Sequence, residues 1–199
     1  MLSLSVCVGC NDAPADPPGG NGALEQGNFT YACASAADTF CSGATPSTLP
    51  TGIALGSDFQ LRFDAAQSTL EVDPAFFDLA TDGTTLHAKQ AGFGAVLVHA
   101  PSGEVIDFVN LHVHGVGALQ LRGADAVTML AVGETRAVHA APYDSGGNLL
   151  AGALAYEWTS SDPNVVAVDA TPDGAATLHA LAAGDAAVRV VSGSTTVAL

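Results

Sequence analysis

Three short segments of the first half of this chain recur 92 positions later in the second half. They are Leu86-His87-Ala88, Ala91-Gly92 and Ala95-Val96, which match Leu178-His179-Ala180, Ala183-Gly184 and Ala187-Val188. Upstream, Ile53-Ala54-Leu55-Gly56 matches Leu130-Ala131-Val132-Gly133 at an offset of 77, so the second copy contains about 15 more residues between its matching parts. An internal repeat of this length indicates one domain design used twice. Two domains of ordinary size fit into 199 residues.

Both copies have the sequence pattern of strands. The segment Phe59-Gln60-Leu61-Arg62-Phe63 alternates apolar and polar residues, as half-buried strands do. Turn residues interrupt the chain about every ten positions, and no long helical period is present. The sequence therefore predicts an all-β fold made of two sandwiches.

Each Ala-Gly pair is expected to form a tight turn between two core strands, because glycine adopts backbone conformations that a Cβ disfavours. Residues on either side of the turn should then alternate between the core and the solvent. In the second copy we expect inward side chains at Leu178, Ala180, Ala186, Val188 and Val190, and outward side chains at His179, Ala187 and Arg189.

The second copy also contains a series of short motifs. They are Val132-Gly133-Glu134-Thr135, Gly146-Gly147-Asn148, Trp158-Thr159-Ser160-Ser161-Asp162-Pro163-Asn164, Val166-Ala167-Val168-Asp169 and Ala180-Leu181-Ala182-Ala183-Gly184. With these motifs, residues 116–199 resemble the bacterial immunoglobulin-like group 2 (BIG2) family. The resemblance implies an exported immunoglobulin-like β-sandwich, of a kind found in bacterial surface proteins, including adhesins, and beside extracellular enzymes. Many such domains are plain spacers, so the fold does not determine the function.

Residues 27–115 are expected to form a divergent immunoglobulin-like β-sandwich, because they share the repeat but lack the tryptophan series. Asp73-Pro74 is expected to stand where Asp162-Pro163 does. Phenylalanines would supply the bulk that Trp158 supplies to the second core. The candidates are Phe59, Phe63, Phe76, Phe77, Phe93 and Phe108.

The amino terminus resembles the end of a bacterial lipoprotein signal. A short apolar run leads to Val8-Gly9-Cys10, which matches the last part of a lipobox with Cys10 as the lipidated residue. Residues 1–10 would then be the signal, and the Pro- and Gly-rich residues 11–26 a flexible tether. Lipid on Cys10 would anchor the exported chain in the cell envelope, at the outer membrane or its periplasmic face, without a spanning helix. The alternative is a buried first strand with two ordinary thiols.

The charge of the chain excludes one class of partner. Twenty Asp and Glu against five Lys and Arg give a net charge of −15. Such a chain repels phosphate backbones, so nucleic acid is not an expected partner. The acidity itself affects solubility and identifies no ligand.

Cys33 and Cys41 lie in a polar segment of an apparently exported chain, so we expect a disulfide between them. The alternative is a metal site formed with His112 and His114. These two histidines lie on one face of an expected strand and could chelate copper or zinc, but an isolated pair binds weakly. We therefore assign no metal site, and solvent-facing histidines remain the other interpretation.

Two further kinds of site were considered. Asp162, Asp169 and Asp173 lie near loops and could bind calcium, although Asp162-Pro163 is also typical of a turn. No nucleophile elbow, zinc-protease helix or phosphate loop is present in the sequence, so no catalytic residue and no cofactor are assigned.

The sequence thus favours a non-enzymatic, lipid-anchored envelope protein whose immunoglobulin-like domains mediate adhesion or bind an unknown protein or glycan. One alternative is a passive spacer, which predicts patch-free faces and no concave pocket. Another is a periplasmic protein that binds a small molecule or a metal, with a cleft near Gly115-Val116-Gly117.

Overall fold

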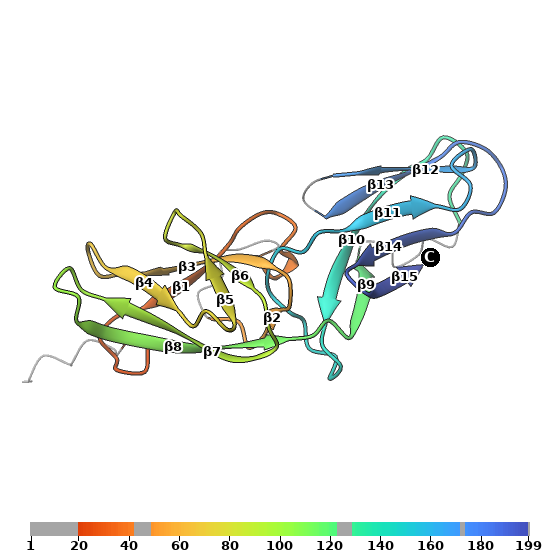
Figure 1. Ribbon diagram of the computed structural model, residues 1–199. Helices are drawn as coiled ribbons and strands as arrows, with labels where there is room; N and C mark the ends of the chain where they lie inside the picture. Colours follow the sequence, from red (N-terminus) through yellow and green to blue (C-terminus); the bar gives the residue numbers. More distant parts are fainter. Residues whose placement is uncertain (1–19, 42–48, 123–128, 172–173, 199) are drawn as a thin grey trace, which may run out of the picture.

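The structure, a computed structural model, describes residues 20–41, 49–122, 129–171 and 174–198. Two β-sandwiches follow each other along the chain (Figure 1). The first contains β1 (Phe29–Cys33), β2 (Ile53–Ala54), β3 (Asp58–Phe63), β4 (Thr69–Val72), β5 (Phe77–Leu79), β6 (Thr85–Ala88), β7 (Gly92–His99) and β8 (Val105–His114). The second contains β9 (Ala118–Arg122), β10 (Thr135–Tyr143), β11 (Glu157–Ser160), β12 (Val166–Ala170), β13 (Ala175–Ala180), β14 (Val188–Ser192) and β15 (Thr195–Ala198). Among the described residues the one helical element is a 3-10 turn, η1 (Thr39–Cys41), and no helix is long and apolar enough to cross a membrane.

The two sandwiches share one strand order. The sheet β1-β3-β6-β5 of the first corresponds to β9-β10-β13-β12 of the second, and β8-β7-β4 corresponds to β15-β14-β11. The first sandwich adds β2 beside β8. Four strands facing three in this order is the arrangement of the immunoglobulin constant-type fold. The predicted class, two tandem immunoglobulin-like β-sandwiches, is therefore confirmed.

The sequence repeat corresponds to a repeat of backbone hydrogen bonds. The amide of Gly56 donates to the carbonyl of Ala88 at 2.8 Å, and the amide of Gly133 donates to the carbonyl of Ala180 at 2.7 Å. Both glycines have positive φ angles, 82° and 89°. A side chain with a Cβ is disfavoured in this conformation, which explains why glycine stands at both positions.

Asp73 and Asp162 begin equivalent turns, as the sequence predicted. Oδ1 of Asp73 accepts the amide of Ala75 at 3.0 Å, and Oδ1 of Asp162 accepts the amide of Asn164 at 3.0 Å. The backbone carbonyl of each aspartate also accepts two amides further along the chain. A carboxylate that caps its own turn in this way stabilises the exit from a strand.

Each Ala-Gly pair stands between two core strands, as expected, but these two strands do not pair with each other as in a hairpin. Ala91 directly precedes β7, whose first residue is Gly92, and Ala183-Gly184 lies between β13 and β14. In both copies the strand before the pair and the strand after it belong to different sheets, so the chain crosses from one sheet of its sandwich to the other at this point. Alternation along a strand shows which face is buried but not which sheet the strand joins.

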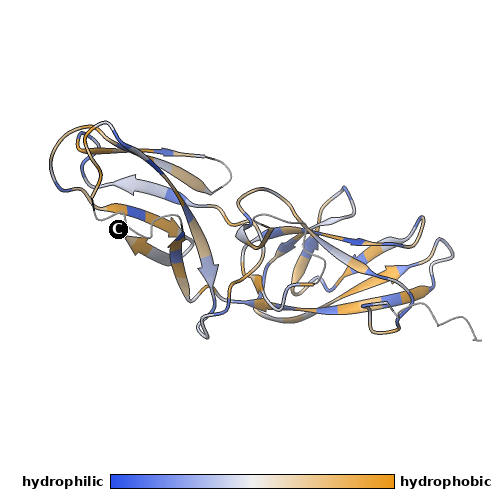
Figure 2. Ribbon diagram, turned by 180° about the vertical axis from the view of Figure 1, so that it is seen from behind, coloured by the Kyte–Doolittle hydropathy of each residue, from blue (hydrophilic) through white to orange (hydrophobic). Residues whose placement is uncertain are grey.

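The expected directions of the side chains are largely confirmed. Leu178, Ala180, Val188 and Val190 are buried, whereas Ala187 and Arg189 are exposed. The remaining two positions, Ala186 and His179, are half-buried. Figure 2 shows the resulting alternation of apolar and polar residues along the strands.

Aromatic rings fill the first core. Tyr31, Phe59 and Phe77 are fully buried, and the rings of Tyr31 and Phe59 stack with their centroids 5.8 Å apart. In the second core Trp158 takes this role. The expectation fails for Phe93, which is 65% exposed because it lies on the outer face of β7. It also fails for Phe108, which is half-buried and does not belong to this cluster.

Part of the expected tether belongs to the first sandwich. Asp107 on β8 is fully buried, and its two carboxylate oxygens accept the amides of Leu24 and Gln26, both at 2.9 Å. The amide of Ala23 donates to the carbonyl of Phe108 at 2.8 Å. A buried carboxylate needs such donors, so this segment is held in place and the tether assignment is wrong for residues 20–26. Residues 11–19, like the signal at 1–10, lie outside the described residues.

The additional residues of the second copy join the two sandwiches. The connection between β10 and β11 leaves the second sandwich and pairs with the first. Ala151 exchanges backbone hydrogen bonds with Gly52 and Ala54 at 3.0 and 2.8 Å, and Ala153 exchanges two with Asp58 at 2.7 and 3.0 Å. The buried side chains of Ala54, Leu150 and Leu154 form a small apolar cluster at this seam.

Candidate functional site

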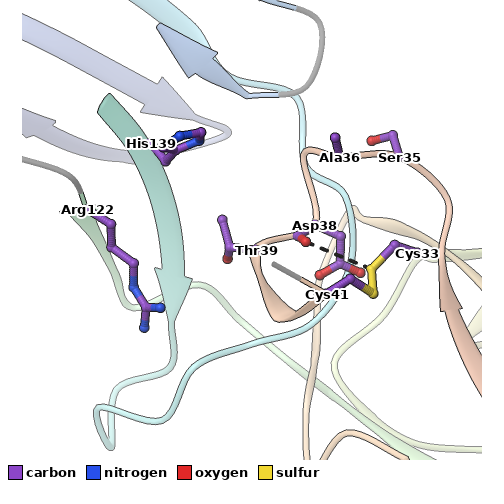
Figure 3. Close-up of a pocket in the computed structure, with 8 residues that line it drawn as sticks. All are labelled: Cys33, Ser35, Ala36, Asp38, Thr39, Cys41, Arg122 and His139. Carbon is purple, nitrogen blue, oxygen red and sulfur yellow. Dashed lines mark hydrogen bonds between the residues drawn. A yellow bond between two sulfur atoms is a disulfide. The ribbon is translucent and has the colours of Figure 1, made fainter. Parts of the chain in front are cut away.

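A hollow of about 630 Å³ lies beside the seam, next to the two cysteines of the first sandwich (Figure 3). One wall comes from the segment between β1 and the end of η1, and the other from β9 and β10 of the second sandwich. The lining residues are Cys33, Ser35, Ala36, Asp38, Thr39, Cys41, Arg122 and His139.

Asp38 is the one carboxyl group among the described residues of this lining, and it is almost fully buried. It accepts hydrogen bonds from the hydroxyl of Tyr31 and, at 3.0 Å, from the amide of Phe40. Burial raises the pKa of Asp38, although both hydrogen bonds oppose the rise. Burial, together with the nearby charge of Asp38, also raises the pKa of the hydroxyl groups of Tyr31 and Tyr156.

Most of the reactive side chains among the described lining residues are already engaged with each other or with neighbours. The sulfurs of Cys33 and Cys41 are bonded to each other, and Arg122 donates to the hydroxyl of Tyr143 at 2.5 Å. The hydrogen bonds of Asp38 hold the loop that contains it. We therefore interpret the buried carboxyl group as part of the support for the seam.

The expected disulfide between Cys33 and Cys41 is present, with the Cα atoms 6.1 Å apart. The alternative, in which these thiolates bind a metal together with His112 and His114, is wrong. The two sulfurs are bonded to each other and cannot bind a metal as thiolates, and the two imidazoles line a separate hollow. Cys10, the expected site of lipidation, lies outside the described residues.

His112 and His114 lie on the outer face of β8, at its end nearest the seam. Their rings are in contact with centroids 3.7 Å apart, and the ring of Phe93 stacks on His112 at 3.9 Å. They line a hollow of about 370 Å³ together with Asp144 of the second sandwich. Nδ1 of His114 is 3.8 Å from Oδ2 of Asp144.

Asp144 is a residue that the sequence analysis missed. It follows β10 directly and begins the connection that pairs with the first sandwich. The Gly-rich sequence after it indicates a turn, and an aspartate in a turn does not by itself predict a binding site. The absence of a matching segment in the first copy was the available signal, since an insertion in a repeat marks a feature that one copy has gained.

No interaction between described residues brings together the three aspartates that could bind calcium. Oδ1 of Asp162 caps its own turn, and Oδ2 of Asp169 pairs with Nε2 of His179 at 3.0 Å. Asp173 lies outside the described residues.

A third hollow, of about 780 Å³, lies at the end of the second sandwich. Its walls are the segment before β10, the β11–β12 connection and the β13–β14 connection. Three large apolar side chains at this end are exposed: Met129 by 86%, Val132 by 62% and Leu181 by 55%. We call this surface the distal hollow. Its lining residues are Met129, Leu130, Val132, Ser161, Val165, Val166, Leu178, Ala180, Ala182, Ala183, Gly184, Asp185, Ala186, Ala187 and Val188.

The sequence analysis did not single out the distal hollow, although Val132 and Leu181 stand in the motifs used for the fold. Large apolar residues within a few positions of turn glycines were the signal that could have found it. Turns of this kind are normally polar, so large apolar side chains there indicate a contact surface.

No protein-family model matches the sequence, and no curated protein matches it. Domains 4 and 5 of the S-layer protein SbsC are similar in structure, with a TM-score of 0.37, 12% sequence identity, and coverage of 86% of this chain and 94% of that one. The Escherichia coli adhesin FdeC has a TM-score of 0.34, 13% identity and coverage of 87% and 63%. The β-glucuronidase of Parabacteroides merdae has a TM-score of 0.32, 11% identity and coverage of 74% and 22%. Because all three TM-scores are below 0.5, the fold assignment rests on the strand order of the chain itself.

Proposed function

We propose that this chain is a non-enzymatic interaction module of the bacterial cell envelope and that its distal hollow binds a partner protein. The observation that carries this proposal is the group of exposed apolar side chains, Met129, Val132 and Leu181, around a hollow at one end of the molecule. A passive spacer has no need for such a surface. Clustered apolar exposure on an otherwise acidic chain is typical of a binding site.

The composition of the distal hollow favours a protein partner. Its lining is mainly Ala, Val and Leu, with Ser161 and Asp185 as the polar side chains among the described lining residues. An apolar wall of this kind can accept an aliphatic or aromatic side chain from another protein. To a glycan the described lining residues offer two hydrogen-bonding side chains, Ser161 and Asp185, besides backbone groups.

Two features support a location outside the cytoplasm. The disulfide between Cys33 and Cys41 is a bond that oxidising compartments favour. The sequence before the first sandwich has the pattern of a lipoprotein signal ending at Cys10. The proposal therefore includes a lipid anchor on Cys10 and membership of residues 116–199 in the BIG2 family.

Photo-crosslinking in cells that produce the protein tests the proposal. With Val132→p-benzoylphenylalanine we expect a covalent adduct with one partner protein. Leu181→Asp in the same chain should lower the yield by about tenfold or more, because it places a charge beside the lining residues Ala180 and Ala182.

The control is Val105→p-benzoylphenylalanine, at an exposed valine of the first sandwich. It should give no such adduct. An adduct that forms equally at Val105, an adduct that Leu181→Asp leaves unchanged, or no adduct at Val132 would each contradict binding at the distal hollow and favour a spacer.

A further inference from the structure

The end of β8 presents two imidazoles to the second sandwich. Alternate residues of β8 point to opposite faces, so Leu111 and Val113 enter the core while His112 and His114 lie on the outer face. Both histidines are half-buried. A His-x-His pair on one face of a strand brings two nitrogen ligands close together, which suits Zn²⁺, Ni²⁺ and Cu²⁺.

Asp144 supplies a carboxylate from the other side of the seam. Its Oδ1 accepts the amides of Gly146 and Asn148, both at 2.8 Å. Its Oδ2 accepts the side-chain amide of Asn148 at 3.0 Å and faces His114 with its remaining lone pair. The turn thus holds the carboxylate in place while one oxygen stays available.

The distance between Asp144 and His114 fits a shared ion. Oδ2 and Nδ1 are 3.8 Å apart, which is too far for a hydrogen bond. Two ligand atoms that each lie about 2.0–2.1 Å from one Zn²⁺ are separated by about 3.3 Å at a tetrahedral angle and by about 4.1 Å when opposite. The observed distance lies within that interval.

We propose that His112, His114 and Asp144 form a site for a divalent transition metal ion that links the two sandwiches. Nδ1 of His114 keeps its place opposite Oδ2 of Asp144, and the ring of His112 turns so that one of its nitrogens faces the ion. Water from the hollow of about 370 Å³ completes the coordination. The site is independent of the distal hollow, so either proposal can fail without the other.

Metal titration of the full chain tests this proposal. All samples lack a polyhistidine tag and carry Cys7→Ser and Cys10→Ser, so that free thiols contribute no ligand. Calorimetry with Zn²⁺ and Ni²⁺ should show one ion per chain. His114→Gln and Asp144→Asn should each weaken binding by about tenfold or more. Asp144→Asn keeps an oxygen that can accept the turn hydrogen bonds, so the seam should stay folded.

The matched control is His179→Gln. His179 is also half-buried and also pairs with an aspartate, but it lies on β13 away from the seam. This variant should bind as the wild type does. Electron paramagnetic resonance of the wild-type chain with one Cu²⁺ should show coupling to two imidazole nitrogens, a measurement that does not depend on any variant.

Three results would overturn the proposal: no binding by the wild type at millimolar Zn²⁺ and Ni²⁺, equal loss of affinity in His179→Gln, or a Cu²⁺ spectrum without two nitrogen ligands.

Discussion

Gly152 lies at a close contact between the two sandwiches. Its φ angle is 109°, and a Cβ at this position would lie 2.0 Å from Oγ of Ser57. Ser57 is fully buried, and its hydroxyl donates to the carbonyl of Ala54 at 2.6 Å. Neither the backbone conformation nor the space admits another residue.

Gly152→Ala should therefore destabilise the protein more than an alanine at a glycine in open space. Gly83 is the control, because its φ angle is 70° and nothing lies within 4 Å of its Cβ position. Gly83→Ala carries only the conformational cost, whereas overpacking adds about 1–3 kcal/mol at Gly152. Urea denaturation of both variants measures the difference. An equal loss in the free energy of unfolding for both variants would show that the structure around Ser57 rearranges to accept the added Cβ.

Asp38 predicts a dependence of stability on pH. Its pKa in the folded state is raised above the ordinary value of 3.8. Between that value and the raised pKa, the native state holds more protons than the unfolded state, so the free energy of unfolding falls as the pH rises. Asp38→Asn cannot titrate and should lack this fall. The stability of the variant relative to the wild type should thus increase with pH through this window and then level off. A constant difference in urea denaturation across these pH values would contradict the account.

At the scale of single residues, the sequence revealed pairs whose chemistry is local. Cys33 and Cys41 lie close in the chain, and in an oxidising compartment two neighbouring cysteines are expected to form a disulfide with each other. Asp144 escaped notice because its proximity to His114 arises only when the connection after β10 folds back on the first sandwich. Buried Asp38 escaped notice for the same reason, since burial by a distant element leaves no local pattern.

At the scale of elements, the repeat predicted the shared strand order, because matching turns at Gly56 and Gly133 imply matching strands. The role of the additional residues could not be read from the sequence. Ala151 and Ala153 pair with the first sandwich through backbone amides and carbonyls, which are the same in every residue type and leave no sequence pattern. The error at Ala91-Gly92 has a similar origin, since a turn residue does not show which sheet the next strand joins.

Leu150→Ala tests whether these additional residues hold the seam. Leu150 is buried against Ala54 and Leu154. Its truncation should cost about 2–5 kcal/mol. Hydrogen exchange should then accelerate most at the seam amides of Ala54, Asp58 and Ala153, because local opening breaks their hydrogen bonds.

Leu178→Ala is the matched control for this prediction, because Leu178 is equally buried but lies in the core of the second sandwich. It should accelerate exchange within that core and not selectively at the seam. The same pattern of exchange in both variants would show that the seam is not a separate unit of stability.

At the scale of the whole molecule, the proposed anchor and the proposed binding surface lie at opposite ends. Figure 1 shows residues 20–26 at the end of the first sandwich and the connections around the distal hollow at the opposite end of the second. A lipid on Cys10 would therefore hold one end at the membrane while the apolar surface faces away from it. The seam keeps these ends apart by joining the sandwiches through backbone pairing.

The claim that this chain works at the cell envelope, on which the interaction proposal depends, has a direct test. Intact mass is measured on protein from the membrane fraction of bacteria that produce it, with iodoacetamide labelling before and after reduction. The account predicts acyl chains on Cys10, their loss in Cys10→Ala, and labelling of Cys33 and Cys41 only after reduction. Unacylated protein in the soluble fraction, with Cys33 and Cys41 labelled without reduction, would contradict it.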